Sequence, residues 1–195
     1  MKTRAAQREE TRARIVEAAL KCFSERGFLG ASTREIARRA GENQGLITYH
    51  FQSKEELWRA AVDQIFGKLK AELGELPALL PSEDRRARAR ASIRAFVRFA
   101  AAHPELFRLM MWEGTCDEPR MQWIVDVHLR PFYEGPGFGD VADDELKPHF
   151  HYVLAGAASI IFAVAPECRR LTGLDPTSSE AIERHADFVA GLLVP

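Results

Sequence analysis

The apolar residues of this chain recur every three or four positions, which is the spacing of helices that bury one face. Over residues 11–26 they form one stripe among charged neighbours. The stripe consists of Ile15, Ala18, Ala19, Cys22 and Phe23. Gly27 follows it and can take the left-handed conformation that ends many helices. The pattern therefore predicts an all-α chain whose first helix covers about Thr11–Arg26.

Two short helices are expected next, at about Thr33–Ala40 and Gln44–His50. Ser32 and Glu35 are spaced as in a capping box, where each side chain accepts a hydrogen bond from the other residue's backbone amide. Asn43 can cap the second of these helices, because its side chain can accept from a free amide of the first turn.

The rest of the chain continues as helices separated by Pro and Gly. Ser53 can cap a fourth helix, with apolar positions at Leu57, Ala61, Ile65, Leu69 and Leu73. The segment from Leu76 to Pro81 interrupts the pattern, and Gly135 to Gly139 is expected to be a loop. Further helices are predicted at about Ser82–Ala102, from Pro104 onward, and at about Pro119–Tyr133, Asp143–Ala165 and Thr177–Leu193.

The composition is that of an ordinary folded protein. Of the 195 residues, 46% are hydrophobic and 28% are charged, which argues against a disordered, fibrous or membrane-spanning chain. No apolar run reaches the roughly 18 residues of a spanning helix, and the start of the chain is charged. We therefore expect a cytoplasmic protein with no membrane partner. Cys22, Cys116 and Cys168 stand far apart and are expected to be packing residues.

The net charge of −1 conceals an asymmetry. Residues 1–60 hold 12 Lys and Arg against 8 Asp and Glu, a net of +4, whereas residues 61–195 hold 15 against 20, a net of −5. A basic segment beside an acidic remainder is typical of a polyanion-binding head on a body with a different partner.

Residues 33–51 have the arrangement of a helix, a tight glycine-containing turn and a short helix. This suits a helix-turn-helix, whose second helix enters the DNA major groove. The side chains expected to pack the two helices together are Ile36, Ala37, Ala40 and Ile47. Those able to meet base edges or phosphates are Gln44, Thr48, Tyr49 and His50. Gly45 would let the backbone approach DNA closely, and Lys54 and the helix ends near Ser32 and Ser53 would attract phosphates.

The alternative is a small three-helix bundle that does not bind DNA. In that case Tyr49 and His50 would pack, and Gln44 would be solvated. Phe51 is expected in the core under either interpretation. For His50 a DNA-side role and a capping or packing role are equally favoured.

Residues 11–57 resemble the N-terminal domain of the TetR family. The resemblance is carried by AALKCFSERGF, STREIARRAG and GLITYHFQSKEEL. It implies an all-α homodimer in which a three-helix helix-turn-helix head, residues 1–55, binds DNA. A larger helical domain, residues 56–195, would bind a ligand and dimerise. Members of this family are usually repressors that a ligand releases from DNA.

The resemblance also implies roles for particular residues. Phosphate contacts are implied for Ser32, Tyr49 and Lys54, and base-edge contacts for Gln44, Gly45 and Thr48, with Arg34 as a further candidate. Thr33 and His50 complete the expected DNA-binding set. The sequence departs from the family pattern at two positions: Thr48 stands where the family usually has an aromatic residue, and Asn43 where it usually has Ser.

The body carries more bulky side chains than a few short helices need. This permits a ligand pocket between helices, although a well-filled core is the alternative. The residues expected to line the pocket are Phe99, Phe107, Met111, Trp112, Trp123 and Val127. Glu113, Asp126 and His128 could add polar contacts to an apolar or aromatic small-molecule effector.

Neither a metal site nor an enzyme is expected. His149 and His151 stand two residues apart, and such positions point away from each other on a helix, so the pair cannot chelate one ion. No sequence pattern of a hydrolase, metalloprotease or nucleotide-binding loop occurs. We therefore expect no cofactor.

The last two long helices each present a face of small and apolar residues. Across a two-fold axis these faces would form a four-helix dimer interface, as the resemblance also implies, although packing within one chain is the alternative. The interface residues expected are Tyr152, Gly156, Ser159, Ile160, Ala186 and Ala190.

These observations predict a dimeric repressor whose partners are an operator in double-stranded DNA and a small-molecule effector. A helical protein-interaction module without DNA binding is the alternative from a different class. An enzyme that uses the cavity of the body is a more remote one.

Overall fold

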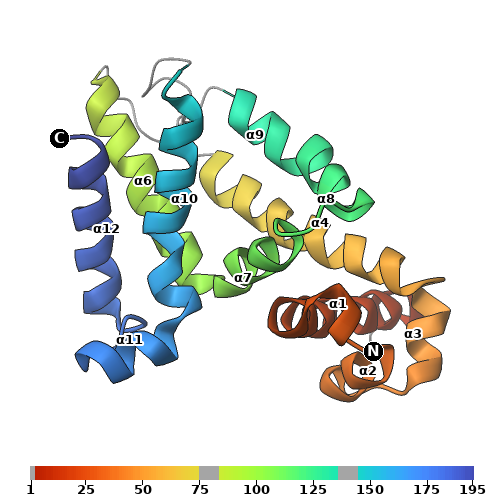
Figure 1. Ribbon diagram of the computed structural model, residues 1–195. Helices are drawn as coiled ribbons and strands as arrows, with labels where there is room; N and C mark the ends of the chain where they lie inside the picture. The colour runs from red at the N-terminus through yellow and green to blue at the C-terminus, as the bar shows by residue number, and fades with distance from the viewer. Residues whose placement is uncertain (1–2, 75–83, 136–144) are drawn as a thin grey trace. The chain divides into compact units, whose positions relative to one another are not determined.

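The computed structural model describes residues 3–74, 84–135 and 145–195, and within these ranges it contains helices and turns but no strand. The prediction of an all-α fold is confirmed. In chain order the helices are α1 (Arg4–Gly30), α2 (Thr33–Ala40), α3 (Gln44–His50), α4 (Lys54–Gly74), α6 (Arg85–Ala102), α7 (Pro104–Glu113), α8 (Pro119–Ile124), the π-helical turn η1 (Val125–Leu129), α9 (Arg130–Glu134), α10 (Lys147–Ala163), α11 (Ala165–Thr172) and α12 (Ser179–Leu193) (Figure 1).

The chain forms two compact units. Residues 1–67 and 108–116 make one, here called the head unit, and residues 68–107 and 117–195 make the other, the body unit. Helices α4 and α7 each continue from one unit into the other. This division describes where contacts are dense, and the functional boundary expected after residue 55 stays a prediction.

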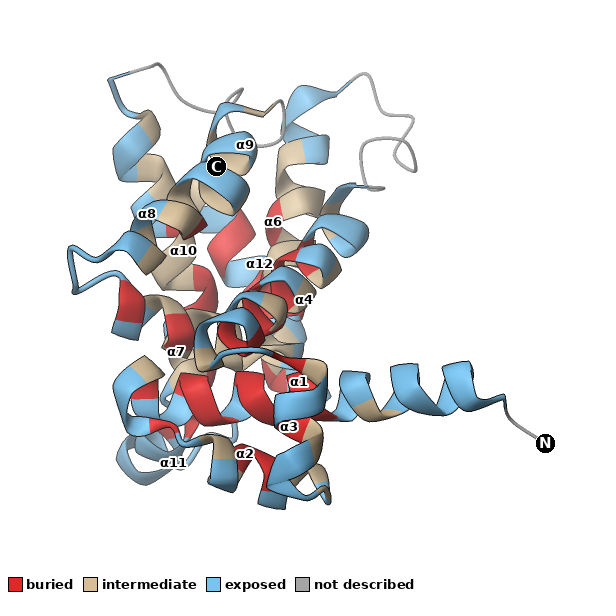
Figure 2. Ribbon diagram, turned by 90° about the vertical axis from the view of Figure 1, so that its right-hand side faces the viewer, coloured by how far each residue is buried: buried red, intermediate tan, exposed pale blue. Residues whose placement is uncertain are grey.

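The head unit buries the facing sides of α1, α2 and α3 (Figure 2). Its fully buried side chains include Ile15, Cys22, Phe23, Ile36, Leu57 and Trp58. Helices α2 and α3 begin and end where the sequence predicts. Ser32 Oγ accepts a hydrogen bond from the Glu35 amide at 3.2 Å, and Asn43 Oδ1 accepts one from the Leu46 amide at 3.0 Å.

Helix α1 differs from its expected bounds at both ends. It begins at Arg4, where Thr3 Oγ1 accepts a hydrogen bond from the Ala6 amide at 3.2 Å. Gly27 has a positive φ of 66°, but its ψ of 175° is not that of a left-handed helix terminus, and the helix resumes to Gly30. Gly27 therefore interrupts the helix, whereas the sequence predicted that it ends there.

The body unit is built on α6, α10 and α12, which lie side by side (Figure 1). Their shared core consists of Ile93, Val97, Ala100, Leu154, Ala158, Phe162, Ala186, Val189, Ala190 and Val194. At its edge, Arg94 pairs with Asp187 at 2.6 Å and Arg98 donates to both Glu183 oxygens at 2.7 and 2.6 Å. These exposed pairs join α6 to α12 along the edge of the shared core.

Two predicted helices of the body differ in detail from the structure. The helix expected at about Pro119–Tyr133 is the continuous run of α8, η1 and α9, in which η1 is a π-helical turn. The helix expected to reach Ala165 ends at Ala163, because Val164 leaves helical geometry and Pro166 stands in the first turn of a separate helix, α11. The two helices meet at a bend of 75°. The predictions at Leu76–Pro81, Ser82, Asp143 and most of the loop before it lie outside the described residues.

No single helix within the described ranges is long and apolar enough to cross a membrane. Among the described residues, the bent pair of α10 and α11 is the one pair that meets the test of length and composition together.

Candidate functional site

Helix α3 exposes polar atoms on one side and buries Ile47 on the other. Gln44, Gly45 and Thr48 are exposed, and the Tyr49 side chain is 63% exposed. This is the face that a helix-turn-helix presents to a major groove. Ile36, Ala37 and Ile47 are buried as predicted, and Ala40 is half-buried.

Two polar side chains of α3 make long hydrogen bonds, at the upper limit of hydrogen-bond length. Gln44 Nε2 lies 3.5 Å from Thr33 Oγ1, which links α3 to α2. Thr48 Oγ1 donates to the Gln44 carbonyl at 3.5 Å. A β-carbon at Gly45 would come within 3.1 Å of Asn43 Oδ1, the atom that caps α3. The absence of a side chain at Gly45 thus preserves the cap and leaves the backbone of α3 accessible to a close approach.

An arginine–glutamate network fastens α2 to α1. Arg39 pairs with Glu25 of α1 at 2.7 Å and with Glu35 at 2.9 Å, and Arg38 binds both oxygens of Glu35. These hydrogen bonds, first from Arg38 and then from Arg39, lower the pKa of Glu35 to about 2. The carboxylate predicted to complete a capping box with Ser32 is therefore held by two arginines of its own helix.

Other residues of the predicted DNA-binding set lie at the beginnings of α2 and α4. Ser32 and Arg34 are exposed and Thr33 is half-buried. Lys54 Nζ lies 4.6 Å from the centroid of the Phe28 ring and 3.5 Å from the Leu29 carbonyl. Lys54 is therefore positioned by the end of α1 while part of its side chain remains exposed.

His50 lies between two aromatic rings. Its ring centroid is 5.1 Å from that of Tyr49 and 6.3 Å from that of Phe51, which is buried as expected. Burial, followed by the charges of Arg8 and Arg12, lowers the pKa of His50. Its Nδ1 is buried without a hydrogen-bond partner. The imidazole is thus neutral at neutral pH and adds no positive charge to this face.

The early turns of α1 add basic residues that the sequence analysis did not select. The Arg8 guanidinium lies 5.4 Å from the centroid of the Tyr49 ring, and that of Arg12 lies 5.1 Å from the Phe51 ring. Figure 2 shows these first turns of α1 as exposed. The signal was present in the sequence, because Arg4, Arg8 and Arg12 are spaced four apart and share one helix face.

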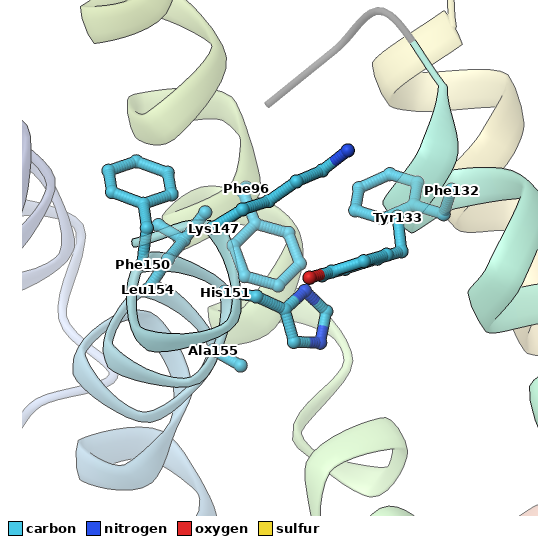
Figure 3. Close-up of a pocket in the computed structure, with 8 residues that line it drawn as sticks. All are labelled: Phe96, Phe132, Tyr133, Lys147, Phe150, His151, Leu154 and Ala155. Carbon is cyan, nitrogen blue, oxygen red and sulfur yellow. The ribbon is translucent and has the colours of Figure 1, made fainter. Parts of the chain in front are cut away.

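A pocket opens in the body unit between α6, α9 and α10 (Figure 3). It is lined by Phe96, Phe132, Tyr133, Lys147, Phe150, His151, Leu154 and Ala155. Five of these residues, from Lys147 to Ala155, recur at helical spacing on one face of α10. Lys147 Nζ lies 4.9 Å from the centroid of the Tyr133 ring. Burial lowers the pKa of His151.

None of the six residues expected to bind a ligand lines this pocket. Phe99 is buried in the body unit, Phe107 and Trp123 are half-buried there, and Val127 is exposed. Met111 and Trp112 belong to the head unit, and about half of each side chain is exposed.

The polar candidates of the body are also dispersed. Glu113 is buried in the head unit. Asp126 is exposed and accepts hydrogen bonds from Gln122 and Arg130. His128 stacks edge-on with Trp123.

The residues expected at a dimer interface differ in how far their side chains are exposed to solvent. Tyr152 is 75% exposed, Ile160 is exposed and Gly156 is half-buried. Ser159, Ala186 and Ala190 are buried within the chain itself, the latter two in the core against α6. A partner would reach them only if that packing were broken. On α12 the exposed apolar residues are instead Phe188 and Leu192.

Residues 15–61 match the family model described as bacterial regulatory proteins, tetR family. The transcriptional repressor SCO4008 of Streptomyces coelicolor is 33% identical over 170 residues, which are 84% of this chain and 83% of that protein. The transcriptional activator FasR of Mycolicibacterium smegmatis is 33% identical over 120 residues, 62% of this chain. That match spans about half, 54%, of the length of FasR.

The fold is similar to that of solved regulators. The structure of AibR in complex with isovaleryl coenzyme A and operator DNA superposes with a TM-score of 0.71 at 18% sequence identity. The superposition covers 95% of this chain and 98% of that one.

Proposed function

The chain belongs to the TetR family of bacterial transcriptional regulators, and we propose that it is a homodimeric repressor released from its DNA operator by a small ligand. The observation that carries this proposal is the polar, exposed side of α3 above a buried helix-turn-helix core. A relative of similar length, SCO4008, is a repressor, which favours repression over activation.

In this proposal the head makes both kinds of contact that sequence-specific DNA binding needs. Tyr49, Lys54 and Ser32 would contact phosphates, and Gln44 and Thr48 would meet base edges. Arg8 extends the positive surface beside Tyr49. Phosphate contacts would fix the register of α3 in the groove, and base contacts would select the sequence.

The exposed apolar side chains of α10 and α12 support a dimer. Tyr152, Ile160, Phe188 and Leu192 would lose contact with water if the same helices of a second copy covered them. Two heads held by such an interface would meet two half-sites, one helical turn or a multiple apart. Since this spacing is fixed by the DNA, a small displacement of the heads is enough to weaken binding.

The effector site is proposed in the pocket of the body unit. The ligand-binding roles expected for Phe99, Phe107, Met111, Trp112, Trp123 and Val127, none of which lines that pocket, stay predictions. AibR was solved with both isovaleryl coenzyme A and operator DNA, so this fold accommodates a regulator that has both partners. A ligand that prefers the released form must bind operator-bound protein more weakly by the same factor.

The test is a selection of bound duplexes from a random DNA pool, followed by fluorescence anisotropy over a salt series. We expect one enriched pseudo-palindrome and a steep fall in affinity as salt rises, because each phosphate contact releases counterions. Tyr49→Ala and Lys54→Ala should weaken binding to every duplex similarly, whereas Gln44→Ala and Thr48→Ala should change the preferred bases.

Glu167→Ala, an exposed change on α11, serves as the control and should leave binding unchanged. A protein-interaction module would retain no duplex from the pool. That result, with a correctly folded protein, would overturn the proposal.

A further inference from the structure

Lys147 places a positive charge at the aromatic pocket of the body unit. It is the first residue of α10, and it is half-buried with its Nζ beside the Tyr133 ring. Figure 3 shows its side chain extending across the pocket above Phe96 toward Tyr133. A lysine in this position covers apolar surface with its stem and keeps its ammonium group at the entrance.

The walls of the pocket are apolar and come from three helices. Phe96 projects from α6, Phe132 from α9, and Phe150 and Leu154 from α10 (Figure 3). The space between them that a water-sized sphere can occupy is about 30 Å³, within a larger hollow that is open to solvent. This is well below the roughly 300–1,000 Å³ typical of small-molecule sites, so only a small apolar group can lie between the walls. Such walls suit a compact aromatic ring or a short acyl chain.

Two further polar groups face the same space. The Tyr133 and His151 rings meet edge-on with centroids 5.4 Å apart, and the Tyr133 hydroxyl is directed toward the imidazole (Figure 3). Because burial lowers the pKa of His151, the imidazole is neutral at neutral pH and supplies a hydrogen-bonding group without a second charge. The positive potential at the pocket therefore comes from Lys147.

The end of α10 that forms the pocket adds to this potential. Leu146 precedes the helix and provides no side-chain cap. Lys147, Phe150 and His151 all lie in the first two turns, near the positive end of the helix dipole. A negatively charged group beside Lys147 would be stabilised by both the ammonium group and the helix.

We propose that this pocket binds a small amphipathic carboxylate, with its anionic group at Lys147 and its apolar part between Phe96 and Phe132. This inference rests on the proposed function, in which such a ligand is the effector, and it specifies the chemical class of that effector. A neutral ligand of the same shape would cover part of the ammonium group without pairing it. That unpaired, desolvated charge makes the pocket selective for an anion.

The test compares 4-phenylbutyrate with 4-phenylbutan-1-ol by titration calorimetry on the full chain without DNA. The two probes share the aromatic body and differ in the charge of the head group. We expect the carboxylate to bind at least about tenfold more tightly, since charge-assisted hydrogen bonds are roughly twice as strong as neutral ones. Lys147→Met should remove that preference and leave the affinity for the alcohol nearly unchanged.

Two further variants locate the binding. Ala155→Phe fills the pocket and should weaken both probes alike, because Ala155 is part of its wall. Lys70→Met removes an exposed lysine of α4 and serves as the matched control, with the preference retained. Lys147→Gln repeats the loss of charge with a different side chain, and thermal melting verifies that each variant is folded.

Equal affinity for the two probes, a preference that survives in both Lys147 variants, or no binding of either probe at millimolar concentration would overturn the inference. Anisotropy with the selected operator separates it from the proposed function. If the carboxylate binds through Lys147 but operator affinity does not change, the pocket assignment stands and ligand-controlled release fails.

Discussion

The indole ring of Trp112 lies 3.2 Å from the position that a β-carbon would occupy at Gly27. Both residues belong to the head unit, so the last turn of α7 packs on the point where α1 is interrupted. The backbone of Gly27, with φ 66° and ψ 175°, lies in a region that is essentially restricted to glycine. The backbone conformation strains any larger residue there, and a β-carbon would also push the indole ring away by a few tenths of an ångström.

Gly27→Ala should lower the free energy of unfolding by roughly 1–3 kcal/mol, the usual cost of such backbone strain. Urea denaturation followed by circular dichroism measures the change. Gly67→Ala is the matched control, because Gly67 lies within α4 and a β-carbon there has nothing within 4 Å. The Gly67→Ala protein should be more stable than the wild type by about 0.5–1 kcal/mol. Equal stability of Gly27→Ala and the wild type would contradict this packing.

The acid stability of the head should depend on Glu35. Its pKa is about 2 in the folded chain against 4.5 as the ordinary value, through hydrogen bonds from Arg38 and Arg39. A carboxyl group with a lowered pKa contributes stability that is complete above about pH 4.5 and is lost as pH falls toward about 2. Glu35→Gln should therefore be less stable than the wild type at pH 7, and the difference should shrink through this window.

Thermal melting compares the stability of Glu35→Gln and the wild type at about pH 7, above this window, and at about pH 4 and about pH 3, within it. Glu55→Gln is the control, because Glu55 pairs with Arg59 on an exposed surface of α4, where such pairs contribute about 0–1 kcal/mol. A stability difference between Glu35→Gln and the wild type that stays constant with pH would show that the carboxylate is not held as described.

The helix-turn-helix was predictable because local signals define it. Ser32 and Asn43 each bind an amide three residues ahead, and neither cap depends on distant parts of the chain. These two caps set where α2 and α3 begin, and the side of α3 that is expected to face DNA follows from that start. The first turns of α1 were missed because residues 4–10 contain too few apolar side chains to show a periodicity, although Thr3 provides a local cap of the same kind.

The pocket of the body could not be predicted in the same way. Phe96, Phe132 and His151 belong to three helices and come together only through tertiary packing. A list of bulky residues does not say which of them pack into a core, as Phe99 does, and which line a space. The helical spacing of Lys147, His151 and Ala155 was readable, but only the structure shows what that face of α10 meets.

Arg8 should contribute to DNA affinity without changing sequence preference. Its guanidinium lies beside Tyr49, and a phosphate contact there would add about one to the salt slope of binding. Arg8→Ala should weaken binding to operator and random duplex by the same factor and reduce the slope by about one. Arg170→Ala, on α11 of the body unit, should change neither quantity. An altered base preference in Arg8→Ala would indicate a base contact instead.

Dimerisation should depend on the exposed apolar side chains of α10 and α12. The Phe188 ring is 66% exposed, although a phenylalanine gains from burial, and a second copy of the chain would remove it from water. We expect the wild type to sediment as a dimer at micromolar concentration. Phe188→Arg should sediment as a monomer and lose operator binding, because two like charges would meet near the two-fold axis and each single head would hold only half of the operator.

Gly156→Arg, on α10, should behave in the same way. Leu171→Arg introduces the same charge at an apolar residue of α11 that is somewhat more exposed than Phe188, and should remain dimeric. A monomeric wild type, or a Phe188→Arg protein that remains dimeric while Leu171→Arg does not, would place the interface elsewhere.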